Sequence, residues 1–300
     1  MRFVLTFIFG ACLCLAGANP ALAQFPDNIT AKMQAGPKFP CPPGGYYPPM
    51  YGIVGRNAGD GPAPTEAVSP CTPPEVVAAA TSLGMARSHF NSPLGVKAVM
   101  TIMFTAQGTF ATDGKTARPI EKLDFHVHYG LPGARLMVKV GEKLDITALN
   151  DDAAWKEISE GGAATPAMNR GREMLALTKL TPAGALWSVI EAEGHTQVSH
   201  VGGKTVLRGA SPYDGMDVTV TLDANDRPES VKVVDGKTTY GATFGDYTDG
   251  FESLFLFVFP KHLAWTKNGR PFADLTVTAY KTNPYVVFPV PENVKHASAK

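Results

Sequence analysis

The strongest constraint on the fold of this 300-residue chain is an alternation of apolar and polar residues that recurs between positions 97 and 283. Leu123, Phe125 and Val127, for example, alternate with charged and imidazole side chains. Successive side chains of a β-strand point to opposite faces, so this period of two predicts strands with one buried face. The same pattern places on buried faces Met100, Ile102 and Phe104; Tyr129; Leu136, Val138 and Val140; Leu144 and Ile146; and Met216, Val218, Val220 and Leu222.

Short turn signals separate these segments at the spacing of hairpins. Asn-Gly, Asp-Gly and similar pairs favour the tight turns that join antiparallel neighbours. We therefore predict a mainly β (α+β) fold, with a curved antiparallel sheet or half-barrel of about 9–11 strands. The turn signals lie at 113–114, 132–133, 202–203, 225–226, 235–236 and 268–269.

Two regions have helical spacing instead. Residues 75–90 follow Thr72-Pro73-Pro74, which suits a capped first turn. Residues 166–194 predict two short helices divided at Thr181-Pro182. The second helix is either an ordinary packing helix or a lid across one face of the sheet. It would bury Ala185, Leu186, Val189 and Ile190, with Trp187 on its flank.

The first residues, MRFVLTFIFGACLCLAGANPALAQ, read as a secretory signal peptide. Arg2 is the basic start, an apolar stretch of about 15 residues follows, and Ala21-Leu22-Ala23 fits the cleavage pattern. The predicted organisation is a signal peptide over 1–23, a Pro/Gly-rich arm over 24–74 and a half-barrel-like domain over 75–300. The expected location is the periplasm, with no membrane span after the signal is removed.

The arm contains 12 Pro and 7 Gly in 51 positions, which excludes a helix or a central strand. Cys41 and Cys71 are an even pair in an oxidising compartment, so they predict a disulfide. Its loop of about 30 residues would add roughly 3 kcal/mol of stability. The arm is either a polar extension or a surface for an envelope protein partner, through Tyr46, Tyr47, Met50 and Tyr51.

Charge and motifs exclude several functions. The chain has 27 basic and 27 acidic residues, and loss of Arg2 leaves 26 against 27, so nucleic-acid binding is not supported. The G-x-S-x-G, P-loop, H-E-x-x-H and Rossmann patterns do not occur. Asp246 and Asp249 in GDYTDG fit a tight turn better than a carboxylate pair. We predict no cofactor and no catalytic residue, and an enzyme is the less favoured class.

His126 and His128 are the one arrangement that suggests a metal. On a strand they would share a face about 6.5 Å apart, together with Asp124. His195 and His200 could approach them. The simpler interpretation is a solvated polar face, and we predict no metal ligand.

The run LFLFVFPKHLAW at 254–265 is apolar on both faces of any strand it forms. Phe255, Phe257 and Phe259 would make one stripe, and the residues between them the other. It is too short to cross a bilayer as a helix, which takes about 20 residues. Its second face must therefore be covered by helices, by the arm or by an apolar ligand. Plain core and the wall of a ligand site both remain.

The last third of the chain carries a family resemblance. VTLDANDRPESVKV (220–233), GDYTDG (245–250), ADLTVTAYKTN (273–283) and FPVPENVK (288–295) follow one another in an order that resembles the lipoprotein-sorting carrier superfamily, the LolA/LolB-like half-barrels. The chain is also similar to uncharacterised secreted bacterial proteins with this tail and the LTKLTPAGALW pattern. The resemblance covers about residues 75–295 and implies a concave face, lidded by helices, that holds acyl chains. Carriers of this superfamily hold their helical lid with a basic residue, and the resemblance does not assign that role to Arg170 or Arg172 of the insertion.

Three hypotheses follow. The first is an exported, non-enzymatic carrier or chaperone for a lipid or other apolar ligand. The second is an envelope interaction module that docks through the arm. The third is a metal-dependent hydrolase, or its accessory, built on His126 and His128. For the first, the predicted ligand-binding residues are Phe255, Phe257, Phe259, Trp187 and Trp265.

Overall fold

The computed structural model describes residues 73–85, 88–89, 92–93, 99–112, 116–130, 132–192, 196–211, 214–248 and 257–298. All of these lie in one compact unit, Cys41–Lys300. The predicted signal peptide, nearly all of the arm, and Cys41 and Cys71 with their predicted disulfide lie outside the described residues.

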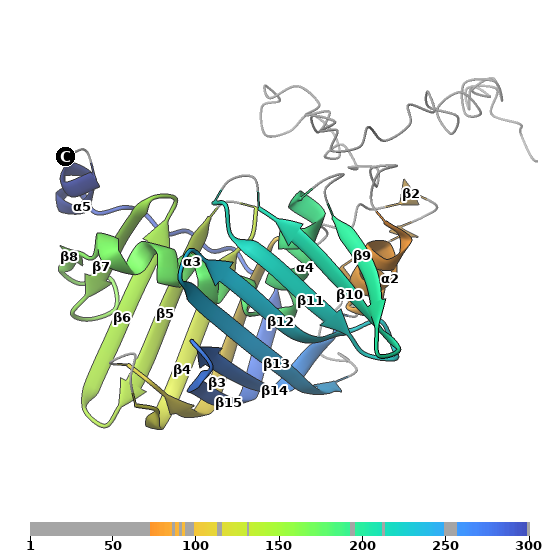
Figure 1. Ribbon diagram of the computed structural model, residues 1–300. Coiled ribbons are helices and arrows are strands. Elements are labelled where there is room, and N and C mark those ends of the chain that lie inside the picture. Colours follow the sequence, from red (N-terminus) through yellow and green to blue (C-terminus); the bar gives the residue numbers. More distant parts are fainter. Residues whose placement is uncertain are drawn as a thin grey trace, which may run out of the picture. The chain divides into compact units, whose positions relative to one another are not determined.

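The described part is mostly antiparallel sheet, which confirms the predicted fold class (Figure 1). A 13-stranded sheet accounts for most of it, and β1 (Ser88–His89) and β2 (Ser92–Pro93) form a separate pair. The strands of the large sheet are β3 (Thr101–Phe110), β4 (Arg118–His128), β5 (Gly133–Val140), β6 (Lys143–Asn150), β7 (Ala153–Glu157), β8 (Ala164–Pro166), β9 (Gln197–Val201), β10 (Lys204–Ala210), β11 (Asp217–Leu222), β12 (Pro228–Asp235), β13 (Thr238–Thr248), β14 (Phe259–Lys267) and β15 (Arg270–Thr282). The sheet exceeds the predicted strand number because the short β7, β8 and β9 lack a clean alternation.

The sheet is open. Its order is β8-β7-β6-β5-β4-β3-β15-β14-β13-β12-β11-β10-β9, so two meanders meet where β3 pairs with β15. The edge strands β8 and β9 do not pair with each other, and no barrel closes. The two arms of the sheet are therefore β3 to β8 on one side of this seam and β9 to β15 on the other.

The cross-strand register places one apolar face along the sheet from β7 to β10, which we call the inward face. Residues directly opposite one another on successive strands are all buried. One such row runs through Leu207, Val220, Val231, Ala242, Trp265, Ala273 and Phe110, and another through Ile102, Val127, Ala134, Leu149 and Ala154. Burial of such rows is the dominant stabilising contribution to a fold of this kind.

Two predicted buried positions are wrong. The side chains of Met100 and Leu144 are 47% and 41% exposed. Met100 precedes the first residue of β3, and Leu144 is the second residue of β6. Met100 lies at the rim of the sheet, beyond the packed core. Leu144 lies on the opposite face, because the pairing of Ala134 with Leu149 places the odd-numbered residues of β6 on the inward face.

The turn predictions hold where the structure describes them. Asn268 and Gly269 both have positive φ, 52° and 73°, and join β14 to β15. That pair of left-handed residues is the turn that matches the twist of two neighbouring strands. The prediction for GDYTDG is wrong at Asp246, whose φ is 55° inside β13. The register of β13 with β14 is the same on both sides of Asp246, where Gly245 pairs with His262 and Tyr247 with Pro260, so Asp246 lies inside a strand and not in a turn. Asp249 lies outside the described residues.

The helical insertion connects the two edges of the sheet. It contains η1 (Met168–Arg170), α3 (Gly171–Lys179) and α4 (Pro182–Glu191), divided where the sequence predicted. Thr181 caps α4 by accepting a hydrogen bond from Gly184 N at 3.1 Å. Helix α3 contacts β5 and β6 on one arm and β12 on the other. The insertion therefore bridges the two arms across the inward face (Figure 1).

Helix α4 is more buried than predicted. Its residues 182–190 are all buried, where the sequence suggested one apolar face with Trp187 on a flank. It contacts β10, β11, β12 and α2 (Pro74–Ser82). Gly209 makes the close approach to β10 feasible, because a Cβ atom there would lie 2.6 Å from the Cβ of Ala192. Pro73 occupies the N-cap of α2, and Thr72, the predicted cap, lies outside the described residues.

The aromatic run begins differently from the prediction. Strand β14 starts at Phe259, so Phe257 and Val258 precede it, and residues 254–256 are outside the described part. Val258 N donates a hydrogen bond to Leu83 O, next to the end of α2, at 3.0 Å. The run is therefore not a strand that is apolar on both faces. Its described residues pass from α2 into β14, which explains why successive residues are buried.

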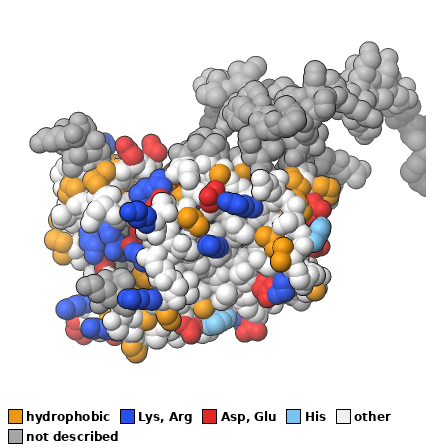
Figure 2. All heavy atoms as spheres, in the orientation of Figure 1, with side chains coloured by type: hydrophobic (Ala, Val, Ile, Leu, Met, Phe, Trp, Pro, Cys, Tyr) orange, Lys and Arg blue, Asp and Glu red, His pale blue; other side chains and the backbone are white. Residues whose placement is uncertain are grey.

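The C-terminal segment covers part of the opposite face. Phe288 and Val294 form a second apolar cluster with Ala148, Ala153 and Trp155, separate from the main core. Helix α5 (Glu292–Ser298) contacts β7 and β8 there. Elsewhere on the surface, charged side chains of both signs are interspersed, as Figure 2 shows for one face.

Candidate ligand-binding site

A continuous line of aromatic rings crosses the inward face at the seam between the arms. Ring centroids are 6.2 Å apart for Phe257 and Phe259, and 5.4 Å apart for Phe259 and Phe104. The line continues from Phe104 to Phe125 at 5.7 Å and from Phe125 to Trp265 at 6.1 Å. Most of these contacts are tilted or edge-on, which is the favourable arrangement for aromatic pairs. We call these five residues the aromatic line.

The structure places three of the predicted ligand-binding residues on the aromatic line. Phe257, Phe259 and Trp265 are fully buried, at 0% exposure each. Trp187 lies apart from them on α4, where its ring stacks on Tyr129 and its Nε1 donates to Val99 O at 2.7 Å. Phe255 lies outside the described residues. In this state the protein itself covers the described candidates. A ligand therefore reaches them only if the helical insertion of η1, α3 and α4, which we call the cover, moves.

Sequence reasoning missed the rest of this surface. Phe104 and Phe125 were predicted to be buried, but nothing in the sequence linked them to Phe259 and Trp265. Phe110 and Phe272 extend the line beyond Trp265, with centroids 6.5 Å from Phe110 to Trp265 and 5.0 Å from Phe110 to Phe272. Phe104 and Phe125 meet the aromatic residues of β14 because β3 pairs with β15, and no local sequence pattern predicts that pairing.

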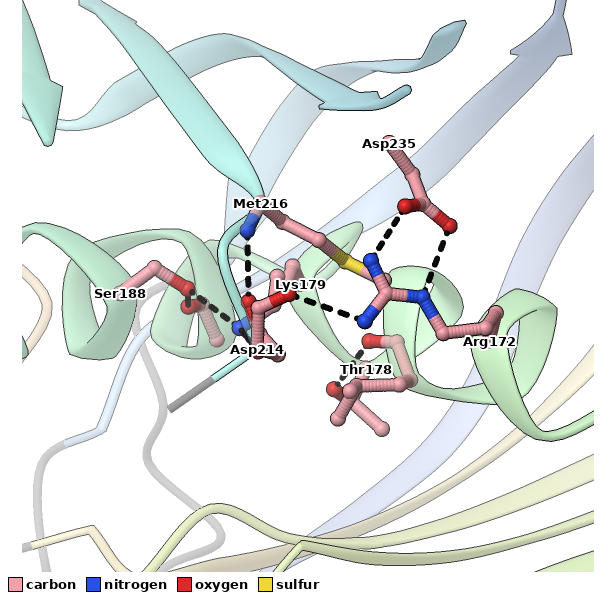
Figure 3. A network of polar contacts seen from close by, with 9 residues as sticks. Arg172, Thr178, Lys179, Ser188, Asp214, Met216 and Asp235 are labelled. Carbon is pink, nitrogen blue, oxygen red and sulfur yellow. Dashed lines mark hydrogen bonds and ion pairs between the residues drawn. The ribbon is translucent and has the colours of Figure 1, made fainter. Parts of the chain in front are cut away.

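Ion pairs at one rim hold the cover in place (Figure 3). Arg172 of α3 donates from Nε and Nη2 to the two carboxylate oxygens of Asp235, and from Nη1 to Asp214 O at 2.9 Å. Lys179, at the end of α3, lies 2.8 Å from the Asp214 carboxylate. The Lys179 and Asp214 side chains are only 7% and 10% exposed. Arg170, the other arginine considered from the sequence, pairs with Glu173 of α3 instead.

A second charged group lies under α3 on the inward face. Glu173 Oε2 accepts a hydrogen bond from Lys267 Nζ at 2.6 Å, and Oε1 lies 3.0 Å from Arg170 Nη2. The Lys267 ammonium also lies over the rings of Tyr240 and Phe272, 5.5 and 6.0 Å from their centroids. Burial, with the nearby Glu173 and Asp235 charges, raises the pKa of Tyr240 to about 12.

The histidine stripe is less solvated than the simpler interpretation of the sequence predicts. His126 and His128 are half-buried on β4, opposite Met103 and Thr101 of β3. His200 lies on β9 at the far edge of the sheet, and His195 is outside the described residues. Among the described residues, no group of three His, Cys, Asp or Glu side chains is placed to hold a metal ion.

Desolvation lowers the pKa of both histidines below the usual 6.5. The unfolded chain therefore binds protons first as the pH falls, so stability is retained above about pH 6.5 and lost below it. We expect His126→Gln to reduce this acid destabilisation, by less than about 1 kcal/mol because the side chain is only half-buried. Urea unfolding between pH 7.5 and 5 measures it. An unchanged pH dependence in the variant would contradict the assignment.

Within the described part of the chain, no helix has the length and apolar character needed to span a bilayer. No family model and no curated protein matches the sequence. Among solved structures, a LolA superfamily protein from Nitrosomonas europaea aligns over 70% of this chain and 94% of its own, at 8% identity and a TM-score of 0.42. An uncharacterised conserved protein from Thermus thermophilus aligns over 73% and 94%, at 12% identity and a TM-score of 0.26. With TM-scores below 0.5, neither similarity bears on what this chain binds.

Proposed function

We propose that this chain is a periplasmic carrier or chaperone that binds a lipid or another apolar ligand on the inward face and catalyses no reaction. One observation carries the proposal. The sheet is open at both edges, its inward face is apolar from strand to strand, and an edge-to-edge insertion fixed by rim ion pairs lies across it. Recognition would be mostly apolar burial with few polar contacts.

The energies are compatible with a cover that moves. When the cover moves, both charges of a pair such as Lys179–Asp214 enter water together, so neither is left buried alone and the cost of opening lies mainly in the apolar surface that is uncovered. Each methylene of a ligand that becomes buried on that surface contributes about 0.8 kcal/mol, so the gain rises with chain length. A long acyl chain therefore offsets the cost of opening far better than a small apolar solute. The proposal therefore favours long-chain ligands.

Three tryptophans locate the ligand. Trp187 and Trp265 are in the main core, and Trp155 lies in the cluster on the opposite face. The probe is octadecanol that carries two bromine atoms in the middle of its chain, because bromine quenches tryptophan fluorescence at short range. We expect this probe to quench the fluorescence of the Trp155→Phe protein strongly. It should leave the fluorescence of Trp187→Phe/Trp265→Phe protein, which retains Trp155, nearly unchanged. Circular dichroism of each variant verifies folding.

Quenching confined to Trp155, or no quenching in either protein, would contradict the proposal. Native mass spectrometry of protein purified from its own cell envelope is the complementary measurement. A co-purified lipid supports the carrier function. A stoichiometric protein partner or bound zinc, without lipid, would favour the other two hypotheses instead.

A further inference from the structure

The charged group under α3 has an excess of positive charge. Arg170 and Lys267 supply two cations and Glu173 one carboxylate, while Asp235 and Asp214 are engaged by Arg172 and Lys179. The Glu173 side chain is 10% exposed, and those of Arg170 and Lys267 are 23% and 25% exposed. Buried or half-buried charge is costly without a partner, so this excess is a feature that needs an explanation.

Buried polar atoms without partners occur in this charged group and nearby on β14. Among the described residues, Trp265 Nε1 and Arg170 Nε are buried donors without a hydrogen-bond partner, whereas the buried Glu173 Oε1 is held by the ion pair with Arg170 Nη2 at 3.0 Å. Trp265 is fully buried and lies two residues before Lys267 on the same face of β14. Leaving a buried donor unpaired costs about 1–3 kcal/mol, and such groups are rare in folded proteins. Both of the atoms without any partner are donors.

The aromatic line begins two residues before Lys267 on β14, and Phe272, one of the rings that Lys267 faces, connects to it through Phe110. Trp265 is its first ring, and the centroids from Trp265 to Phe257 are spaced 5.4–6.2 Å apart. Four such steps give an apolar path comparable in length with a long acyl chain. A molecule that lay along this path with one end at Lys267 would have a hydrocarbon body and a polar, acceptor-bearing head.

We propose that Lys267, Arg170 and Trp265 form the head-group site for a long-chain carboxylate, a fatty-acid type of ligand whose chain lies along the aromatic line. This inference rests on the proposed function and narrows its ligand class. A carboxylate offers only acceptors, so it satisfies the Lys267 ammonium and the Trp265 N–H together.

The arrangement permits Lys267 to exchange the Glu173 carboxylate for that of the ligand, with each carboxylate still paired to a cation. In the structure Lys267 is shared with Glu173. When the ligand binds, Lys267 passes to its carboxylate, and Arg170, one turn before Glu173 on the same segment, keeps Glu173. Because Glu173 belongs to α3, the exchange also releases one contact between the cover and β14.

The test compares three brominated octadecyl ligands: the acid, its methyl ester and the alcohol. Binding is followed by tryptophan quenching in the Trp155→Phe protein. We expect the acid to bind at least ten-fold more tightly than the ester. Lys267→Met should remove this preference by weakening the acid and not the ester, whereas Glu173→Gln should strengthen the acid several-fold because the competing carboxylate is gone.

Two further variants separate binding from folding. Lys232→Met removes an exposed lysine of β12 and should leave all three affinities unchanged. Trp265→Phe keeps an aromatic ring, removes the indole N–H and should weaken the acid a few-fold more than the ester. Equal binding of acid and ester in the parent protein would overturn the carboxylate site and leave the carrier function standing. Failure of all three ligands to bind would overturn both.

Discussion

Lys179→Met is expected to lower the free energy of unfolding by about 3–5 kcal/mol, because it leaves a carboxylate buried without its partner. Lys179 Nζ lies 2.8 Å from Asp214 Oδ2, and both side chains are at most 10% exposed. Methionine has a similar length and no charge, so the packing of α3 is largely retained. Chemical denaturation at neutral pH measures the loss.

Asp214→Asn in the Lys179→Met background should recover much of the loss. The amide oxygen can still accept the hydrogen bond that Met216 N donates to Asp214 Oδ1 at 2.9 Å, while the unpaired charge is gone (Figure 3). Recovery on removal of the second charge is the signature of a buried pair, since the cost lies in the charge left behind. This double variant also separates the electrostatic cost from any loss of packing around position 179.

Lys204→Met is the matched control. Lys204 pairs with Glu229 on the surface, where the two side chains are 50% and 41% exposed. Surface pairs contribute about 0–1 kcal/mol, so this variant should be nearly silent. Equal effects at Lys179 and Lys204 would mean that the buried pair does not fasten α3 to the β10–β11 connection, and the cover would then need another anchor.

The sequence was most informative where each residue reports on its own element. Val218 and Val220 could be placed on the buried face from alternation alone, and the division of the insertion could be placed at Thr181-Pro182. Signals of this kind are local, since strand periodicity and helix starts depend on residues within a few positions.

The contacts that make the candidate site are not local. Lys267 and Glu173 are 94 positions apart, and Trp265 meets Phe125 only because β15 pairs with both β14 and β3. Contacts between residues so far apart in the sequence cannot be predicted from the local spacing of apolar and polar residues. The burial of α4 was partly readable, because Ser188 is its only polar residue between Thr181 and Glu191. The helical spacing was interpreted as one apolar face, so the full burial of α4 was not predicted. The role of Arg172 at the rim could not be predicted, because its partners Asp214 and Asp235 are far from it in the sequence.

The core is also expected to be sensitive to alkaline pH, and Tyr129 should be a principal cause. Burial raises the pKa of Tyr129 and Tyr247 well above the usual 10, and that of Tyr240 to about 12. The unfolded chain loses these protons first, so the stability that they contribute is complete below about pH 10 and is lost as the pH rises toward the folded-state values. For Tyr240, which is only 4% exposed, the rise of the pKa to about 12 corresponds to at most about 3 kcal/mol.

Tyr129→Phe isolates one of these contributions. The variant loses the contact between Tyr129 Oη and Thr181 Oγ1 at 2.8 Å, but Thr181 still donates to Thr178 O and accepts from Gly184 N. Its cost at neutral pH should therefore be modest, about 0.5–1.5 kcal/mol. Between pH 9 and 12 its stability should fall less steeply than that of the parent, so that the two curves converge or cross. Tyr285→Phe removes a hydroxyl from a residue that is 92% exposed and should follow the parent curve. Parallel curves for Tyr129→Phe and the parent would mean that Tyr129 ionises as readily in the folded protein as in the unfolded chain, so that α4 does not seal the inward face at this point.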